Sequence, residues 1–380
     1  MTSTTPDLLV LSRLGDWASQ WDRLVDASSL PSPFMRSWWL AGTAGPRPRF
    51  VLVAQNDQLL GGLALEEERR LGVPCLRMMG AGPLCPDHLD LLAASGQEEA
   101  VAKATERWLR RRGSCLLVLE GVLATSRLNT ALPGRVCREA IGVAPWTPIP
   151  ADGQAYIDAR SALFRRNLKR ASARMAAAGA THRVNRGSAA VERLDVLRQL
   201  HDCQWGERSN FLPSFDRFAA GCALAAECDE ISVHELSAGE TVAAILVAFE
   251  VAQRLSLYQS ARLTDNQWRE ASTVLLAAAI SDACGRGFTE VDFLRGDESY
   301  KRNFTSRRRE LVRLRAATGW LGQLALMADT ATSKAKAVAA GAAYLRERRP
   351  RGVPARRTRL IGAHGPVGDQ HHAAPARKGG

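Results

Sequence analysis

The fold prediction starts from the stretch Gly287-Phe-Thr-Glu-Val-Asp-Phe-Leu-Arg-Gly-Asp-Glu-Ser-Tyr-Lys-Arg-Asn-Phe304. A short apolar run carries Asp292 in its middle and stops at Gly296, and Tyr300 and Lys301 follow closely. Open α/β sheets build their sites at the carboxyl ends of strands, so this strand end is a candidate site. The same residues also fit a strand followed by a solvated helix, and the stretch alone leaves both interpretations open.

The elements before this stretch have a defined order. Strands are predicted over residues 231–236, 242–251 and 254–261, and a helix over residues 272–284 follows them. The apolar run at residues 291–294 is then the last strand of a hairpin–strand–helix–strand unit.

The first half of the chain repeats this order. A hairpin over residues 50–65 precedes a helix at 98–112 and a buried strand at 115–120. The glycines after the two helices, Gly113 and Gly287, are 174 residues apart, and those after the two strands, Gly121 and Gly296, are 175 apart. This agreement predicts a duplicated α/β (α+β) unit, although chance recurrence is the alternative. Only the second strand end carries an Asp/Tyr/Lys cluster, so the first half is predicted to be a scaffold.

The length and the charge distribution of the chain indicate how its domains are organised. A chain of 380 residues exceeds one ordinary core, and 46% hydrophobic and 24% charged residues fit a globular protein. Residues 331–380 hold 11 basic and 2 acidic residues, or +9 of the total +12, which leaves +3 for the rest. The basic character is therefore that of a tail, which weakens a nucleic-acid function for the folded body. We predict halves at 1–150 and 151–318, a helical extension at 319–349 and a disordered basic tail at 350–380.

The cysteine pattern indicates a reducing compartment. None of the eight cysteines forms a CxxC pair, so we expect free thiols rather than a disulfide frame or a metal site. His371 and His372 are too isolated for a metal site as well. No signal-peptide pattern is present, and no uncharged apolar run reaches the ~18–20 residues of a membrane span. The expected location is cytoplasmic.

Two helices between the halves carry candidate binding groups. On the helix at residues 161–175, Arg166, Arg170 and Arg174 are four residues apart and form a basic face, which either binds phosphates or is solvated. On the helix at 191–205, His201 is a candidate general base, because histidine titrates near ~6.5, or a structural histidine.

The element order and the motif Asp292-Phe-Leu-Arg-Gly-Asp-Glu-Ser-Tyr-Lys301 resemble a known family. They are similar to the CelD/BcsL-like branch of the GNAT acyltransferases, which is related to the Fem aminoacyltransferases and has an Asp-Phe-x-x-Gly-x-x-x-Tyr-Lys signature. The resemblance covers about residues 8–315. It implies tandem GNAT-like halves with mixed sheets flanked by helices, and transfer of an acyl group from acetyl-CoA or another acyl-CoA, without a metal, to an amine or hydroxyl.

One departure from the family concerns the donor phosphates. GNAT enzymes usually hold a pyrophosphate on a glycine-rich loop at a helix N-terminus, whereas this chain reads Gln267-Trp-Arg-Glu-Ala-Ser-Thr-Val274. Arg269, Ser272 and Thr273 remain as candidate phosphate donors, and Glu270 opposes an anion.

The resemblance also implies roles for individual residues. The thioester arm would lie between residues 254–261 and 291–294, with an oxyanion held by the backbone near Tyr258 or Gln259, where one donor is worth ~3–4 kcal/mol. An acceptor amine needs a base at neutral pH. The candidate bases are Asp292, Asp297 and His201. Tyr300 is the candidate acid that protonates the leaving group, and Lys301 is the candidate cation that orients the acceptor. Structural roles, such as a Lys301–Asp297 ion pair, are the alternative.

The sequence leaves the acceptor open among polysaccharides, lipid precursors, peptides and small amines, and it leaves the oligomeric state open. Two alternatives to acyl-CoA chemistry remain. One is a Fem-like transferase that uses aminoacyl-tRNA, which would explain the basic helix. The other is a non-catalytic GNAT-like module whose basic segments bind RNA or an anionic surface.

Overall fold

The computed structural model describes residues 6–347. The predicted tail at 350–380 lies outside the described residues. The described residues up to Thr330 form one compact unit, and those from Ala331 to Glu347 lie outside it. The helix α11 (Gly319–Glu347) begins in the first unit.

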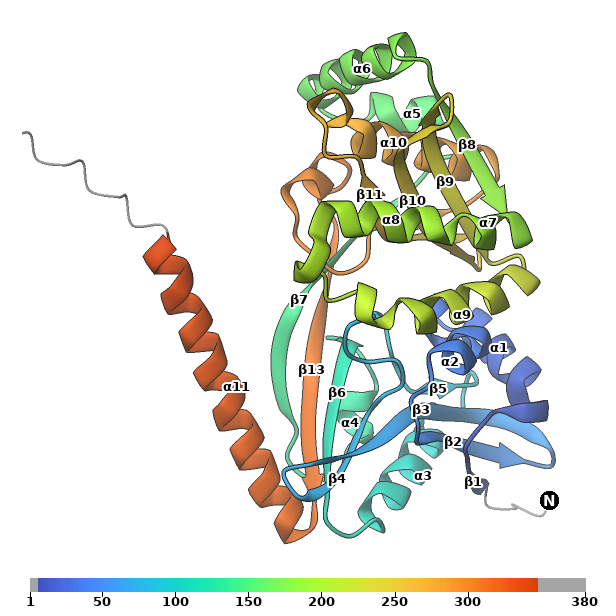
Figure 1. Cartoon of the computed structure of the whole chain (residues 1–380). Helices are drawn as coiled ribbons and strands as arrows, with labels where there is room; N and C mark the ends of the chain where they lie inside the picture. Colours follow the sequence, from blue (N-terminus) through green and yellow to red (C-terminus); the bar gives the residue numbers. More distant parts are fainter. Residues whose placement is uncertain (1–5, 348–380) are drawn as a thin grey trace, which may run out of the picture. The chain divides into compact units, whose positions relative to one another are not determined.

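A single mixed sheet runs through the first unit (Figure 1). Its strand order is β1-β2-β3-β4-β6-β13-β7-β12-β11-β10-β9-β8, with β5 paired to β3. The strands of the first half are β1 (Asp7–Leu11), β2 (Pro48–Gln55), β3 (Gln58–Arg70), β4 (Val73–Met78), β5 (Leu92–Ala93), β6 (Cys115–Leu123) and β7 (Cys137–Pro148). Those of the second half are β8 (Ala180–Arg186), β9 (Ile231–Ala238), β10 (Thr241–Val251), β11 (Arg254–Arg262), β12 (Glu290–Asp292) and β13 (Arg308–Thr318).

The two halves repeat one pattern and exchange their last strands. Each half has antiparallel strands followed by a parallel pair, β4 with β6 and β11 with β12, and a helix connects the members of each pair. The last strand of the second half, β13, inserts between β6 and β7 of the first half, and β7 continues onto β12. The predicted mixed α/β fold is confirmed, and the exchange is an addition that the sequence did not indicate.

Local sequence explains why these elements form. The turn between β2 and β3 has Asn56 and Asp57 at φ 49° and 58°, and both residue types tolerate this left-handed region in a two-residue hairpin. The strand β10 reads as a nearly continuous apolar run because it is buried on both faces. The basic helix α6 (Ala162–Ala177) begins where the Ser161 hydroxyl accepts a hydrogen bond from the Phe164 amide.

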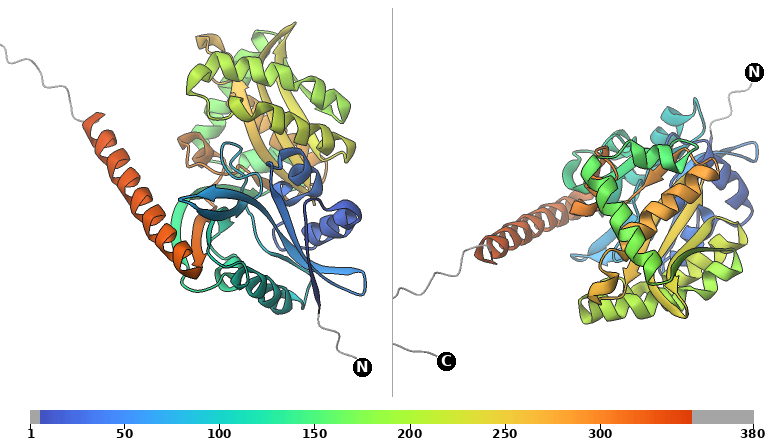
Figure 2. Two further views of the ribbon diagram at one scale, coloured as in Figure 1. Left: turned by 60° about the horizontal axis from the view of Figure 1, so that its bottom comes forward. Right: turned by 90° about the horizontal axis from the view of Figure 1, so that it is seen from above.

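The helices form layers on both faces of the second half's sheet (Figures 1 and 2). One layer packs over β10 and β11 and consists of α5 (Gly153–Asp158), α6 and α10 (Ala271–Gly285). The other layer consists of α7 (Ser188–Glu192), α8 (Leu194–Trp205) and α9 (Phe215–Glu227), and it shares a core with the first half. The first half contributes α1 (Ala18–Asp26), α2 (Ser37–Thr43), α3 (Glu98–Arg110) and α4 (Leu128–Ala131).

The contact between α2 and α9 joins the two halves. A Cβ atom on Gly42 would lie 2.4 Å from the Cα of Gly221, so the backbones touch at this crossing and glycine is required. Nearby, Arg36 pairs with Glu230 at 2.6 Å, and Trp38 donates to the same carboxylate. These contacts fix the first half against the helices that cover the second.

Candidate active site

The parallel strands β11 and β12 pair over only three residues each. The register joins Arg254–Ser256 to Glu290–Asp292, and β11 then continues to Arg262 beside β10 alone. The sheet therefore opens at the carboxyl end of β12, as the sequence predicted. The edge of β11 beyond Ser256 faces this opening.

A β-bulge lies on β11 beside the opening. The register with β10 passes from Ala248–Leu257 to Val247–Gln259, so Tyr258 is the extra residue. Bulges bend a strand and often occur beside active sites. The Tyr258 hydroxyl donates to the Leu84 carbonyl at 2.6 Å, so its ring is anchored to the first half and its backbone is what remains at the bulge.

A cavity of about 560 Å³ occupies the opening. It is lined by eight of the ten predicted site residues, namely His201, Tyr258, Gln259, Arg269, Ser272, Thr273, Tyr300 and Lys301. The two that do not line it are Asp292 and Asp297. Residues from three separate parts of the chain thus meet at one place.

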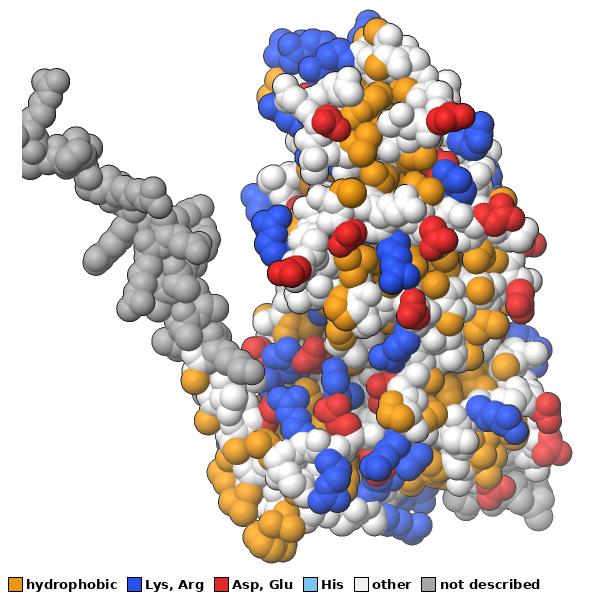
Figure 3. Space-filling view, viewed as in Figure 1, with side chains coloured by type: hydrophobic (Ala, Val, Ile, Leu, Met, Phe, Trp, Pro, Cys, Tyr) orange, Lys and Arg blue, Asp and Glu red, His pale blue; other side chains and the backbone are white. Residues whose placement is uncertain are grey.

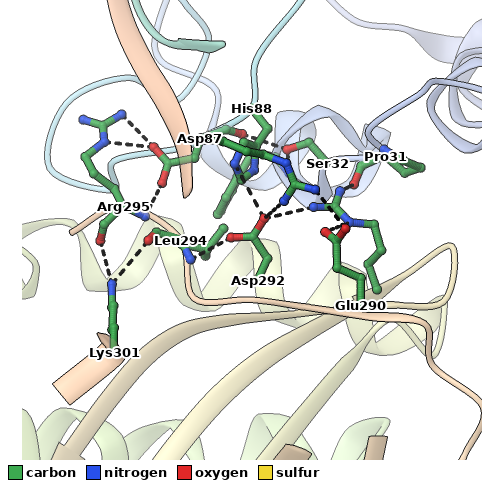
Figure 4. A network of polar contacts seen from close by, with 12 residues as sticks. Pro31, Ser32, Asp87, His88, Glu290, Asp292, Leu294, Arg295 and Lys301 are labelled. Atoms are coloured by element: carbon green, nitrogen blue, oxygen red, sulfur yellow. Dashed lines mark hydrogen bonds and ion pairs between the residues drawn. The ribbon is translucent and has the colours of Figure 1, made fainter. Parts of the chain in front are cut away.

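Asp292 belongs to a buried ion-pair network instead (Figure 4). One carboxylate oxygen accepts from the Leu294 amide at 2.8 Å, and the other accepts from Arg254 at 2.9 Å and Arg309 at 3.0 Å. Glu290 pairs with the same two guanidinium groups. With both oxygens engaged away from the cavity, Asp292 is an anchor of the strand end in this structure rather than a free base.

The first half completes this network. His88 lies 3.6 Å from Asp292 through Nε2, and burial lowers its pKa to about 4. Asp87 pairs with Arg295, whose amide and Nε donate to its two oxygens at 2.6 and 2.9 Å. Burial raises the pKa of Asp87 to about 6, against the opposing effect of the Arg295 charge. The loop that carries both residues therefore fixes the segment that follows β12.

The amine of Lys301 holds the same segment. Its Nζ donates to the carbonyls of Leu294 at 3.3 Å and Arg295 at 3.0 Å and pairs with Glu298 at 2.9 Å. Because Lys301 is buried, these contacts close the loop around it. The Lys301–Asp297 ion pair, which was the structural alternative, is not among these contacts.

Asp297 lies on the outside of the loop. Its pKa is lowered, chiefly by the hydrogen bond from Arg302, and Arg308 lies within ion-pair distance as well. Asp297 does not line the cavity, and its ion pairs among the described residues are with Arg302 and Arg308. Its role as a base stays a prediction.

Tyr300 and His201 present ionisable groups to the cavity. Tyr300 is 38% exposed, and its partial burial raises the pKa of the phenol to about 12, with the Glu298 carboxylate adding to the shift. His201 on α8 is buried beside the Phe211 ring, with Nδ1 3.4 Å from the Ser209 hydroxyl, and burial lowers its pKa. At neutral pH the phenol keeps its proton and the imidazole is without one, which are the states of an acid and a base.

The start of α10 adjoins this cavity. Glu270 precedes the helix and forms an ion pair with Arg174 of α6, which lowers the pKa of its carboxyl group. A second cavity of about 710 Å³ lies between α6 and α10, and it shares Arg269 and Thr273 with the first. Glu270, which was expected to repel a bound anion, is thus paired with a cation.

The equivalent position in the first half is filled by the chain itself. The strands β4 and β6 pair in parallel over Cys75–Arg77, and then Leu89 forms a parallel bridge to Val122. Gly121 has φ 75°, and a Cβ there would lie 2.1 Å from the Pro86 carbonyl oxygen. This glycine lets the loop lie directly against β6, and the gap that is open in the second half is occupied here.

Several residues that line the cavity were not predicted from the sequence. Arg295 and Glu298 stand inside the quoted motif, but their partners could not be inferred, and Gln204, Ser260 and Arg262 had no distinguishing pattern. Asp87 and His88 were also not predicted, although both are buried in the loop between β4 and β5. The signal that could have found them is the cluster of Asp87, His88 and Asp90 within a mostly apolar loop.

Comparisons with known proteins agree with this geometry. Residues 162–302 match the family model described as an acetyltransferase (GNAT) domain, so this part of the chain is similar to that family. The matched range contains β11, β12, α10 and the whole motif from Asp292 to Lys301. No curated protein matches the chain.

Several solved structures share the fold at low identity. The match to the crystal structure of FemX covers 81% of this chain and 96% of the FemX chain, with a TM-score of 0.60 and 10% identity. The C-terminal domain (DUF2156) of a putative lysylphosphatidylglycerol synthetase from Agrobacterium fabrum covers 84% and 96%, with a TM-score of 0.54 and 11% identity. L-PGS from Bacillus licheniformis covers 78% and 90%, with a TM-score of 0.50 and 12% identity. These similarities concern the fold alone.

Proposed function

We propose that this protein transfers an acyl group to an amine or hydroxyl in the cavity between β11 and β12, and that its first half is a scaffold. The observation that carries the proposal is the contrast between the two halves. The second half leaves its parallel pair open onto ionisable side chains, and the first half fills the same gap with residues 84–91. The finer assignment to the CelD/BcsL-like branch remains a prediction.

The chemistry follows from the groups at the cavity. The acceptor atom attacks the acyl carbon, and its proton passes to His201, directly or through water. The backbone at Tyr258 and Gln259 stabilises the oxyanion of the tetrahedral intermediate. The intermediate then collapses, the bond to the leaving group breaks, and the leaving atom takes a proton from Tyr300. Lys301 and Asp292 position the loop that carries Tyr300.

Acyl-CoA is the donor that we propose first. The carboxylate at the start of α10 is paired with Arg174, so it opposes a phosphate less than the sequence indicates. Arg269, Ser272 and Thr273 line the cavity at this helix start and would hold the donor's phosphates in place of a glycine-rich loop.

An aminoacyl-tRNA donor is the second candidate, and α6 is the specific observation in its favour. This helix carries five cations and no carboxylate in its sixteen residues. Cavities of about 710 and 820 Å³ flank it, and the first adjoins the acyl cavity. A basic helix between two grooves offers more phosphate contacts than one CoA needs.

The acceptor stays open among polysaccharides, lipid precursors, peptides and small amines. A non-catalytic module that binds RNA or an anionic surface is the remaining alternative, and the donor experiments below also test it.

Two measurements distinguish the donors. Mass spectrometry of the natively purified protein would detect co-purifying acyl-CoA. Thermal shift with acetyl-CoA and with a non-hydrolysable aminoacyl-tRNA analogue would report binding, since a ligand at 100 times its Kd stabilises by ~2.7 kcal/mol. Stabilisation by neither donor, together with no transfer activity, would contradict the proposal.

A charge-matched pair of variants sharpens the test. Arg166→Glu/Arg170→Glu reverses two cations four residues apart on α6, and Arg107→Glu/Arg111→Glu makes the same change on α3 and the turn after it, where both arginines are exposed. With a tRNA donor, only the α6 pair should weaken binding and reduce its salt dependence. With a CoA donor held at the start of α10, neither pair should change binding more than about threefold.

A further inference from the structure

The start of α11 exposes large hydrophobic side chains. Trp320, Leu324 and Met327 are 70, 50 and 61% exposed, and their spacing places them on one face of the helix. Leu321 lies beside them at 42% exposure. Figure 3 shows hydrophobic side chains gathered at the lower end of the molecule, where α11 begins in Figure 1. Exposed single leucines are ordinary, but four large apolar side chains within two turns are not.

The opposite face of the helix fixes it to the body. Ala325 and Leu326 are buried in a cluster with residues of β4, β6 and β13. Gly322 lies so close to β6 that a Cβ there would be 2.7 Å from the Cys115 carbonyl oxygen. Asp329 is buried and pairs with Arg315 at 2.8 Å. The exposed residues are therefore held outward by a rigidly docked helix.

A second element brings another apolar side chain to this end of the molecule. The turn between β3 and β4 places Leu71 at φ 51° with 55% exposure. The adjacent Arg70 pairs with Asp329 of α11, so the turn lies beside the helix. A leucine in the left-handed region is strained, and its exposure yields no core packing in return. Leu71 and the four α11 residues make up what we call the end patch.

The chain that continues from the end patch is strongly basic. Residues 331–380 carry 11 Lys or Arg and 2 Asp or Glu. An exposed apolar cluster with a tryptophan, tethered to a polybasic segment, matches the two requirements of reversible attachment to an anionic bilayer. A nucleic acid would bind the basic charge, but its phosphates would not contact apolar side chains such as Leu324 and Met327. A second copy of the chain would cover the patch, but it would bring two +9 segments together.

We propose that the end patch inserts into the interface of an anionic lipid bilayer, to which the net charge of +9 on residues 331–380 attracts the protein. The protein would then work at a membrane surface. None of the described helices is long and apolar enough to span a membrane. The inference is independent of the proposed acyl transfer.

The test is co-sedimentation of the full chain with vesicles of phosphatidylcholine containing about 30% phosphatidylglycerol, against pure phosphatidylcholine. Binding is expected to require the anionic lipid and to fall at high salt. Trp320→Ser/Leu324→Ser and, separately, Leu71→Asp should each weaken binding by about tenfold or more. Aspartate tolerates positive φ, so Leu71→Asp tests the patch without straining the turn.

Two controls make the outcome decisive. Leu163→Ser removes a leucine of similar exposure, 58%, from α6 and should leave vesicle binding unchanged. Arg356→Gln/Arg357→Gln/Arg359→Gln should weaken binding to anionic vesicles as the patch variants do. The proposal is overturned if anionic vesicles do not bind, if the patch variants bind like the unaltered chain, or if light scattering shows that the patch variants convert a dimer to a monomer.

Discussion

Arg295 of the second half holds Asp87 of the first half through its amide, its Nε and an Nη2 that lies 2.7 Å from the carboxylate (Figure 4). Asp87 is fully buried, and Arg295 lines the cavity between β11 and β12. The backbone carbonyl of the same arginine accepts from Lys301. The first half, whose own gap is filled, thus contacts the site of the second half directly through this ion pair, in addition to the His88–Asp292 contact.

Asp87→Asn should destabilise the protein and disturb the cavity. Removing one partner of a buried pair leaves the other charge uncompensated and costs about 3–5 kcal/mol. We expect a lower Tm and a higher KM for the donor. Asp297→Asn is the control, because it alters an exposed carboxylate of the same loop and should leave the Tm nearly unchanged. Equal effects of the two variants would show that the ion pair has no special role.

Asp292→Asn and Tyr300→Phe should separate structure from chemistry. Asp292→Asn weakens the contacts to Arg254 and Arg309 and should cost about 3 kcal/mol of unfolding free energy. Tyr300→Phe removes only a hydroxyl at the cavity, so it should leave Tm nearly unchanged and lower kcat by about 10²-fold or more if the phenol is the acid. Unfolding by denaturant and steady-state kinetics on both variants check this. Full activity of Tyr300→Phe would eliminate Tyr300 as the acid.

The pH dependence of transfer should report His201. Burial lowers its pKa, so the fraction without a proton, which is the active base, should rise with pH with a midpoint below the ordinary ~6.5. His201→Gln should lower kcat/KM and abolish this acid limb. The pKa of Tyr300, about 12, places no limb of its own in the neutral range. An acid limb that persists in the variant would assign the base elsewhere.

The pH dependence of stability should report His88. Its pKa is lowered to about 4, so between about 6.5 and 4 the unfolded chain binds a proton that the folded chain does not. This contribution to stability is therefore lost as pH falls through that window, by up to about 3 kcal/mol. His234, with a pKa of about 3, acts in the same direction, and Asp87, with a raised pKa, acts in the opposite one.

The difference between wild type and His88→Asn isolates the His88 contribution. Asparagine suits the φ of 58° at this position and cannot be protonated. Urea unfolding at several pH values should show a flatter loss toward acid pH in the variant. Parallel curves would show that His88 does not remain neutral in the folded state.

The parts of the fold that were predictable are those that local pattern encodes. Apolar runs predicted β2, β3, β6 and β9 to β12, and the glycine spacing indicated the repeat. The strands β4, β5, β7, β8 and β13 were not predicted. The exchange of β7 and β13 between the halves was not predictable, because strand pairing across 170 residues leaves no local pattern. Asp292 shows the same limit at the site. Its position at a strand end favoured chemistry, and only the partners Arg254 and Arg309 from other strands reveal an anchor.

The most direct test of the central claim is amide hydrogen exchange with and without donor. If the donor lies in the cavity between β11 and β12, acetyl-CoA or the aminoacyl-tRNA analogue, whichever binds, should slow exchange in residues 257–262 and at the start of α10. Exchange in β4 and β6 of the first half should not change. Protection confined to the first half, or bound donor with no protection of residues 257–262, would contradict the account.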